Sequence, residues 1–99
     1  MTSPNVEIHP AAVHEATQAR EWYSDKDNSL GVAFADELDR AVDRIANAPE
    51  RWPLYLQNTR CFVLQRFPYL VVYRESATGV QILAVAHVRR RPGYWKSRT

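Results

Sequence analysis

The chain has 99 residues, 45% of them hydrophobic, and a net charge of +2, values that favour one compact domain over residues 1–99 and exclude wholesale disorder. A single cysteine, Cys61, excludes an intrachain disulfide and a cysteine-rich metal site, so we expect no metal and no cofactor. No apolar run approaches the roughly 20 residues of a membrane helix, and the first residues lack the blocks of a secretory signal. We therefore expect a cytoplasmic protein with no membrane partner.

The first half of the chain predicts a short strand followed by two helices. Apolar and polar residues alternate over 6–9, which is typical of a strand, and Pro10 suits the first position of a helix over 10–26. A second helix is predicted from Leu30 to Pro49, with a buried stripe at helical spacing formed by Leu30, Phe34, Leu38, Ala41, Ile45 and Ala48. We expect an antiparallel hairpin with an acidic solvent face, on which Arg40 and Arg44 bond acids one turn earlier.

The second half predicts a sheet. Residues 49–58 form an irregular connection in which Trp52, Leu54 and Leu56 are expected to pack against the core. Strands are predicted over 60–66, 69–74 and 80–89, and their short links favour an antiparallel meander. Alternation along the last strand places Val80, Ile82, Ala84, Ala86 and Val88 on one face and Gln81, Leu83, Val85, His87 and Arg89 on the other.

These elements predict an α+β fold. It consists of an N-terminal strand, then an antiparallel helical hairpin packed on a C-terminal antiparallel β-meander. Residues 1–5 and 96–99 are expected to be flexible.

Positive charge is concentrated in the second half of the chain. Residues 1–58 hold five basic and ten acidic side chains, whereas residues 59–99 hold eight basic side chains and one acid, Glu75. A surface with such an excess attracts polyanions or an acidic partner. We expect these cations to gather along one edge of the fold and to form the functional surface.

Several residue types in this half can carry chemistry. The arginines, His87 and Tyr94 can bind phosphates and stack bases, or stabilise a cleaving phosphodiester without metal, with His or Tyr as proton carrier. The plainer interpretations stay open: a solvated run over 89–91, a packed His87, and Tyr94 and Trp95 as anchors of the tail. The isolated glycines provide no phosphate loop, and the dispersed histidines provide no zinc site.

Two motifs carry a family resemblance. They run from Arg66 to Arg74 (RFPYLVVYR) and from Ile82 to Trp95 (ILAVAHVRRRPGYW). Together with the order of elements, they resemble the RelE/ParE toxin superfamily. The resemblance implies a toxin of a type II toxin–antitoxin module, a function in plasmid stabilisation, and a cognate antitoxin whose acidic segment masks the basic surface in a hetero-oligomeric complex.

The superfamily has two activities. RelE-like members cut messenger RNA in the ribosome, and ParE-like members inhibit DNA gyrase. The RelE-like arginine of the central strand falls at Leu70 here, and no lysine lies between Leu54 and Arg66. The resemblance therefore favours the ParE-like side and a protein that is not an enzyme.

The main hypothesis is thus a toxin that inhibits growth by binding a macromolecular target, with DNA gyrase as a candidate. The residues expected to bind the target or the antitoxin are Arg66, Arg74, Arg89, Arg90, Arg91, Tyr94 and Trp95. The alternative is a ribosome-dependent endoribonuclease, whose catalytic candidates are Arg66, His87, Arg90, Arg91 and Tyr94. A third hypothesis is a nontoxic member that only buffers an antitoxin.

Overall fold

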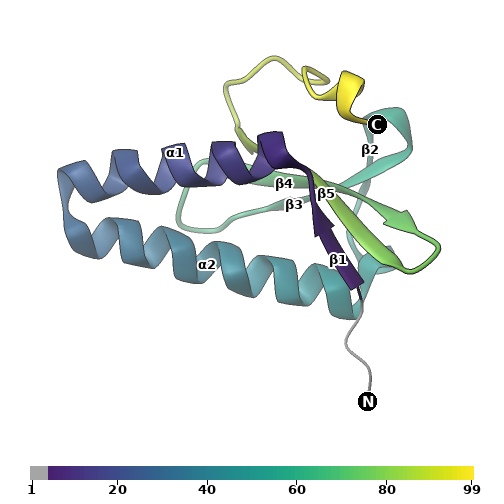
Figure 1. The fold of residues 1–99 in the computed structure, drawn as a ribbon, viewed down its shortest axis with the longest axis horizontal. Helices are drawn as coiled ribbons and strands as arrows, with labels where there is room; N and C mark the ends of the chain where they lie inside the picture. The colour runs from purple at the N-terminus through teal and green to yellow at the C-terminus, as the bar shows by residue number, and fades with distance from the viewer. Residues whose placement is uncertain (1–4) are drawn as a thin grey trace.

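Two antiparallel helices lie on one face of a five-stranded sheet in the computed structural model, which describes residues 5–99 (Figure 1). The helices are α1 (Pro10–Lys26) and α2 (Asn28–Asn47), and the strands are β1 (Asn5–Ile8), β2 (Leu54–Tyr55), β3 (Thr59–Val63), β4 (Tyr69–Ser76) and β5 (Gly79–His87). The strand order is β1-β5-β4-β3-β2, in which β1 runs parallel to β5 and the other neighbours are antiparallel. The predicted α+β fold is confirmed. No helix within residues 5–99 combines the length and apolarity needed to span a bilayer.

The helical hairpin turns at a single residue, Asp27. Its Oδ1 accepts hydrogen bonds from the backbone N and the hydroxyl of Ser29, and these two bonds lower the pKa of the carboxyl. This N-cap starts α2 two residues before the predicted Leu30. Gly31 makes the tight approach of the helices possible, because a Cβ there would lie 1.8 Å from Ser24 Oγ.

The sheet contains two strand pairings that were not predicted from the sequence. Strand β1 joins the sheet at its β5 edge, where Val6 lies opposite Val80 and Ile8 opposite Ile82. The two-residue strand β2 extends the other edge, within the segment predicted to be irregular. Trp52 packs on the core as expected, but Leu54 and Leu56 are 72% and 42% exposed, so their predicted burial is wrong.

A β-bulge in β5 changes which side chains face the helices. Val72 lies opposite Ala84, whereas the next residue, Tyr73, lies opposite Ile82, so Leu83 is an extra residue. As a result Ile82 and Val85 both pack in the helix-facing core, while Ala84 faces the other side. The strict alternation predicted for residues 80–89 is therefore wrong from Leu83 onward.

The core has two parts, one on each face of the sheet. Between sheet and helices, the rings of Tyr23, Phe34, Phe67 and Tyr69 form a cluster with centroids 4.8–6.3 Å apart. On the opposite face, Val72 and Ala84 pack beneath Trp95 of the C-terminal tail. The chain after β5 thus completes a second, smaller core.

Tyr73 is fully buried, and its hydroxyl donates a hydrogen bond of 2.6 Å to the carbonyl of Pro49. Burial raises the pKa of this phenol from 10.0 to about 12. The native state therefore keeps a proton that the unfolded chain releases near pH 10.

This shift predicts alkaline destabilisation. Between pH 10 and 12 the native protein binds more protons than the unfolded chain, so the stabilisation is complete below pH 10 and is lost as the pH rises toward 12. We expect the free energy of unfolding to fall by about 1–3 kcal/mol from this group over that range. Urea unfolding at a series of pH values measures it. The Tyr73→Phe variant should give a flatter curve, and an unchanged slope in that variant would contradict the assignment.

Candidate functional site

The tail after β5 turns back over the sheet and ends in an ordered turn. Gly93, at φ 81°, adopts a left-handed conformation that favours glycine, and Lys96–Arg98 form a 3-10 turn. Trp95 is 1% exposed beneath this turn. The tail is therefore anchored over residues 96–98, where a flexible end was expected, whereas residues 1–4 lie outside the described residues.

Glu15 of α1 holds the end of the tail. Its carboxylate accepts hydrogen bonds from the Tyr94 hydroxyl and from both terminal nitrogens of Arg98, at 2.9 and 3.1 Å. Arg98 also donates to the carbonyl of Leu83, and Glu15 accepts from the backbone N of Val85. These two side chains form hydrogen bonds with backbone groups of β5 at positions beyond those that pair with β1. This part of the strand edge is therefore covered.

The Tyr94 phenol is correspondingly a poor proton donor. Burial raises its pKa, and the hydrogen bond to Glu15 raises it further because the neutral hydroxyl is the donor. The pKa of Arg98 is also raised, first by its hydrogen bond to Glu15. All three groups thus serve to fix the tail on α1.

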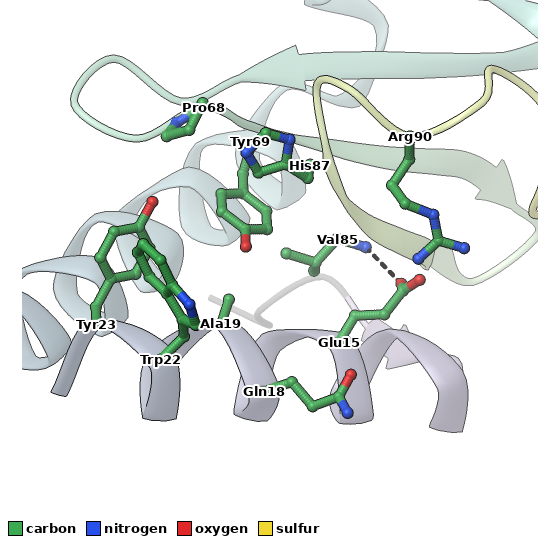
Figure 2. Close-up of a pocket in the computed structure, with 10 residues that line it drawn as sticks. All are labelled: Glu15, Gln18, Ala19, Trp22, Tyr23, Pro68, Tyr69, Val85, His87 and Arg90. Atoms are coloured by element: carbon green, nitrogen blue, oxygen red, sulfur yellow. Dashed lines mark hydrogen bonds between the residues drawn. The ribbon is translucent and has the colours of Figure 1, made fainter. Parts of the chain in front are cut away.

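A cleft of about 430 Å³ lies between α1 and the ends of β4 and β5 (Figure 2). Gln18 and Trp22 of α1 form one wall, and the other comes from Tyr69, His87 and the tail. Figure 2 shows Arg90 pointing from the tail toward the Glu15 side of the cleft. The cleft therefore combines aromatic surface with an exposed guanidinium at its rim.

His87 is fixed by its neighbours. It lies opposite Tyr69 in the register, with the two rings edge to face at 5.1 Å, and its Nδ1 accepts a hydrogen bond from the backbone N of Arg89. This bond leaves Nε2 as the free ring nitrogen. Burial raises the pKa of Tyr69, with a further contribution from Tyr23, so its phenol stays neutral beside the imidazole.

The three consecutive arginines of the tail are exposed. Arg89, Arg90 and Arg91 follow β5 directly, and the Arg90 guanidinium lies 3.9 Å from the centroid of the Tyr94 ring. Among residues 5–99 the recorded ion pairs are Arg60 with Glu75 and Arg98 with Glu15, so none neutralises this run. The run is thus available to an anionic partner.

The remaining cations of the second half are dispersed, which corrects the expectation of one continuous basic edge. Arg60 bonds Glu75 and the carbonyl of Trp52, and Arg74 bonds Gln81 through a 2.8 Å hydrogen bond. Arg66 lies beside α2, in a different pocket from His87 and Arg90. Intramolecular hydrogen bonds and ion pairs therefore occupy some of the cationic side chains that were expected to form a single basic surface.

Leu70 lies on the sheet face away from the helices. It is opposite Val63 and Ala86 and packs with the cluster around Trp95. This position of the central strand thus presents a half-buried aliphatic side chain, with no guanidinium to hold a phosphate.

The five catalytic candidates do not meet in one place. His87, Arg90 and Tyr94 lie in one region, because His87 and Arg90 line the cleft beside α1, the Arg90 guanidinium lies over the Tyr94 ring, and Glu15, which holds the Tyr94 hydroxyl, lines the same cleft. Arg66 is apart from them, in the pocket beside α2. The binding candidate Trp95 is a core residue, as the anchoring interpretation predicted. Among residues 5–99 no three His, Cys, Asp or Glu side chains gather as metal ligands do.

Sequence reasoning missed Glu15. The residue is 12% exposed in its side chain and organises the tail, yet it is one of three acids on α1, with Glu21 and Asp25, and lies 83 positions from its partner Arg98. Its partners have no fixed spacing in sequence. The available signal was an acid on the helix predicted over 10–26, which is a weak one.

Two comparisons with known proteins agree with the fold. A family model described as the ParE toxin of the type II toxin–antitoxin system parDE matches residues 6–92. A solved structure described as the chromosomal ParDE TA system from P. aeruginosa superposes with a TM-score of 0.70 at 17% identity, covering 86% of this chain and 96% of that one. No curated protein sequence matches. The resemblance to the RelE/ParE superfamily is confirmed on its ParE side, and the chain belongs to the ParE toxin family of type II toxin–antitoxin systems.

Proposed function

We propose that this toxin inhibits growth in the cytoplasm by binding a macromolecular target, for which DNA gyrase is the candidate, and that a cognate antitoxin neutralises it. A function in plasmid stabilisation belongs to the same proposal. The observation that carries it is the run Arg89-Arg90-Arg91, which is exposed and lies in a tail that Trp95 anchors on the sheet. Because Trp95 and Arg98 fix the residues that follow, the run needs less ordering when a partner binds.

Binding is better supported than cleavage. A cleaving site needs a phosphate-holding cation beside a proton carrier. Here Leu70 occupies the position of the RelE-like arginine, the Tyr94 phenol is held by Glu15 with a raised pKa, and Arg66 lies in a separate pocket. We therefore rank the ribosome-dependent endoribonuclease below a binding toxin.

The tail run has a direct test in DNA supercoiling. The wild-type protein should inhibit supercoiling of relaxed plasmid by purified gyrase, and the cognate antitoxin should relieve the inhibition. Replacing Arg89, Arg90 and Arg91 together with alanine should raise the inhibitory concentration roughly tenfold or more, since each exposed charge pair contributes about 0.5–1 kcal/mol. Inhibition by the wild type should also weaken as salt rises.

A matched variant controls for net charge. Arg20, Lys26 and Arg51 are exposed cations away from the tail, and replacing all three with alanine removes the same charge. That variant should inhibit like the wild type. If both triple variants lost inhibition equally, net charge alone would explain the effect. If the wild type did not inhibit gyrase at concentrations that stop growth, gyrase would not be the target. New messenger cleavage sites in a translating extract would support the endoribonuclease instead.

A further inference from the structure

A second group of exposed arginines surrounds a small pocket beside α2. Arg40 and Arg44 project from the helix and Arg66 from the link between β3 and β4, and together with Glu37 and Phe62 they line a cavity of about 150 Å³. The sequence predicted that Arg40 and Arg44 bond acids one turn earlier. Within residues 5–99, however, none of the three arginines takes part in an ion pair. Three exposed cations thus line one pocket in which Glu37 is the acid, and no ion pair within residues 5–99 holds them.

The walls of this pocket are held in place. Glu37 Oε2 accepts hydrogen bonds from the backbone N atoms of Gln65 and Arg66, which ties the link between β3 and β4 to α2. The Arg44 guanidinium lies over the rings of Trp52 and Phe62, with centroids 5.4 and 5.8 Å away. The Arg44 side chain and the backbone of Arg66 are therefore restrained before a partner arrives, which lowers the entropic cost of binding.

The other oxygen of the same carboxylate lacks a donor. Glu37 Oε1 is buried and has no hydrogen-bond partner within the described part of the chain. Buried acceptors of this kind are uncommon because each costs free energy until a donor reaches it. Because this oxygen has no accessible surface, Glu37 serves to hold the link between β3 and β4, and the exposed arginines are the groups of the pocket that an outside ligand can reach.

We propose that this pocket binds an Asp or Glu side chain of a partner polypeptide. The guanidiniums hold the carboxylate, since their donors match its two oxygens. The inference rests on the proposed function in one respect: the antitoxin is the polypeptide expected to carry such a segment. The site is separate from the tail run, because the two share no lining residue.

A nucleic acid fits this pocket less well. The exposed Asp36, Asp39 and Asp43 lie along α2 next to the arginines, and they would repel a continuous polyphosphate. A peptide places its carboxylates one by one and can avoid these acids. The acidic neighbours thus favour a polypeptide ligand.

The test is a titration of the isotopically labelled protein with an acetylated, amidated peptide of alternating glycine and glutamate, followed by NMR. We expect the side-chain Nε–H signals of Arg40 and Arg44 and the backbone signals of Gln65 and Arg66 to shift together. The R40Q/R44Q variant should bind the peptide about tenfold more weakly, from two charge-assisted contacts of about 0.7 kcal/mol each. The matched variant R89Q/R91Q, which removes the same charge from the tail, should lose less affinity.

Shifts confined to residues 89–94, or equal losses in the two variants, would overturn the proposal. So would an oligothymidylate of the same charge that shifts the pocket signals with equal or higher affinity, because phosphate would then be the ligand. The titration needs neither gyrase nor growth inhibition. A protein that leaves gyrase untouched but binds the peptide in this pocket would therefore refute the proposed function and support the site.

Discussion

Replacing Trp95 with alanine is expected to lower the free energy of unfolding by about 3–5 kcal/mol. The indole is 1% exposed and packs on Val72 and Ala84, with the ring of Tyr55 6.1 Å away. Its removal leaves a cavity on the face of the sheet opposite the helices, where the tail is the cover. Since domains of this size have a total stability of about 5–15 kcal/mol, a large part of the protein's stability would be lost. Urea unfolding followed by circular dichroism measures the change.

The chain offers a matched control in Trp22. This residue is 56% exposed on α1, so Trp22→Ala should cost about 1 kcal/mol or less. The comparison removes the same side chain from a buried and from an exposed position. Similar losses in the two variants would show that the second core does not depend on the tail.

Replacing Glu15 with glutamine is expected to cost about 2–4 kcal/mol, the second largest effect. The carboxylate is the acidic partner of Arg98, and their side chains are only 12% and 16% exposed. The amide keeps the shape of Glu15 but leaves the guanidinium without its counter-charge, which is the expensive way to break such a pair. We place the value slightly below that of a fully buried pair because both groups retain some contact with water. Chemical unfolding at neutral pH measures it.

Two further variants make this prediction sharp. Glu21→Gln changes an exposed acid on the same helix and should alter stability by less than about 0.5 kcal/mol. The double variant E15Q/R98M removes both charges and should be more stable than E15Q alone, because no unpaired charge remains. If E15Q matched E21Q, Glu15 would not be the anchor of the tail.

The sequence was a good guide wherever a regular period governed the structure. The helix predicted over 10–26 from Pro10 matches α1, and the stripe predicted for the second helix faces the sheet through Phe34, Ala41 and Ile45. The antiparallel meander followed from short links rich in turn residues. Local patterns of this kind depend on residues that are close in sequence, so they can be recognised in a single amino-acid sequence.

Features set by distant contacts were missed. The parallel pairing of β1 with β5 joins residues 74 positions apart, and no pattern in either segment names its partner. The bulge at Leu83 shifts the faces of β5 although the residues continue an unbroken apolar run. Leu54 and Leu56 were assigned to the core by hydrophobicity alone, which is a poor guide for short connections.

The candidate site shows the same division. Counting charges correctly singled out the run over 89–91 as exposed, but the count does not say where a side chain points. Arg98 pairs with Glu15, and Arg60 pairs with Glu75. Arg66 lines the pocket beside α2 together with Arg40 and Arg44. Arg66 belongs to the basic half of the sequence, whereas Arg40 and Arg44 belong to the acidic half. Comparing the net charges of the two halves therefore did not reveal this group.

Strand β5 is closed by two segments that lie far apart in sequence. Its edge receives β1 and then the Arg98 guanidinium, which donates to Leu83 across 15 residues. A chain truncated after β5 would lose the second of these contacts and would expose an open strand edge and the apolar surface that Trp95 covers. Such a truncated protein would be prone to aggregation and proteolysis.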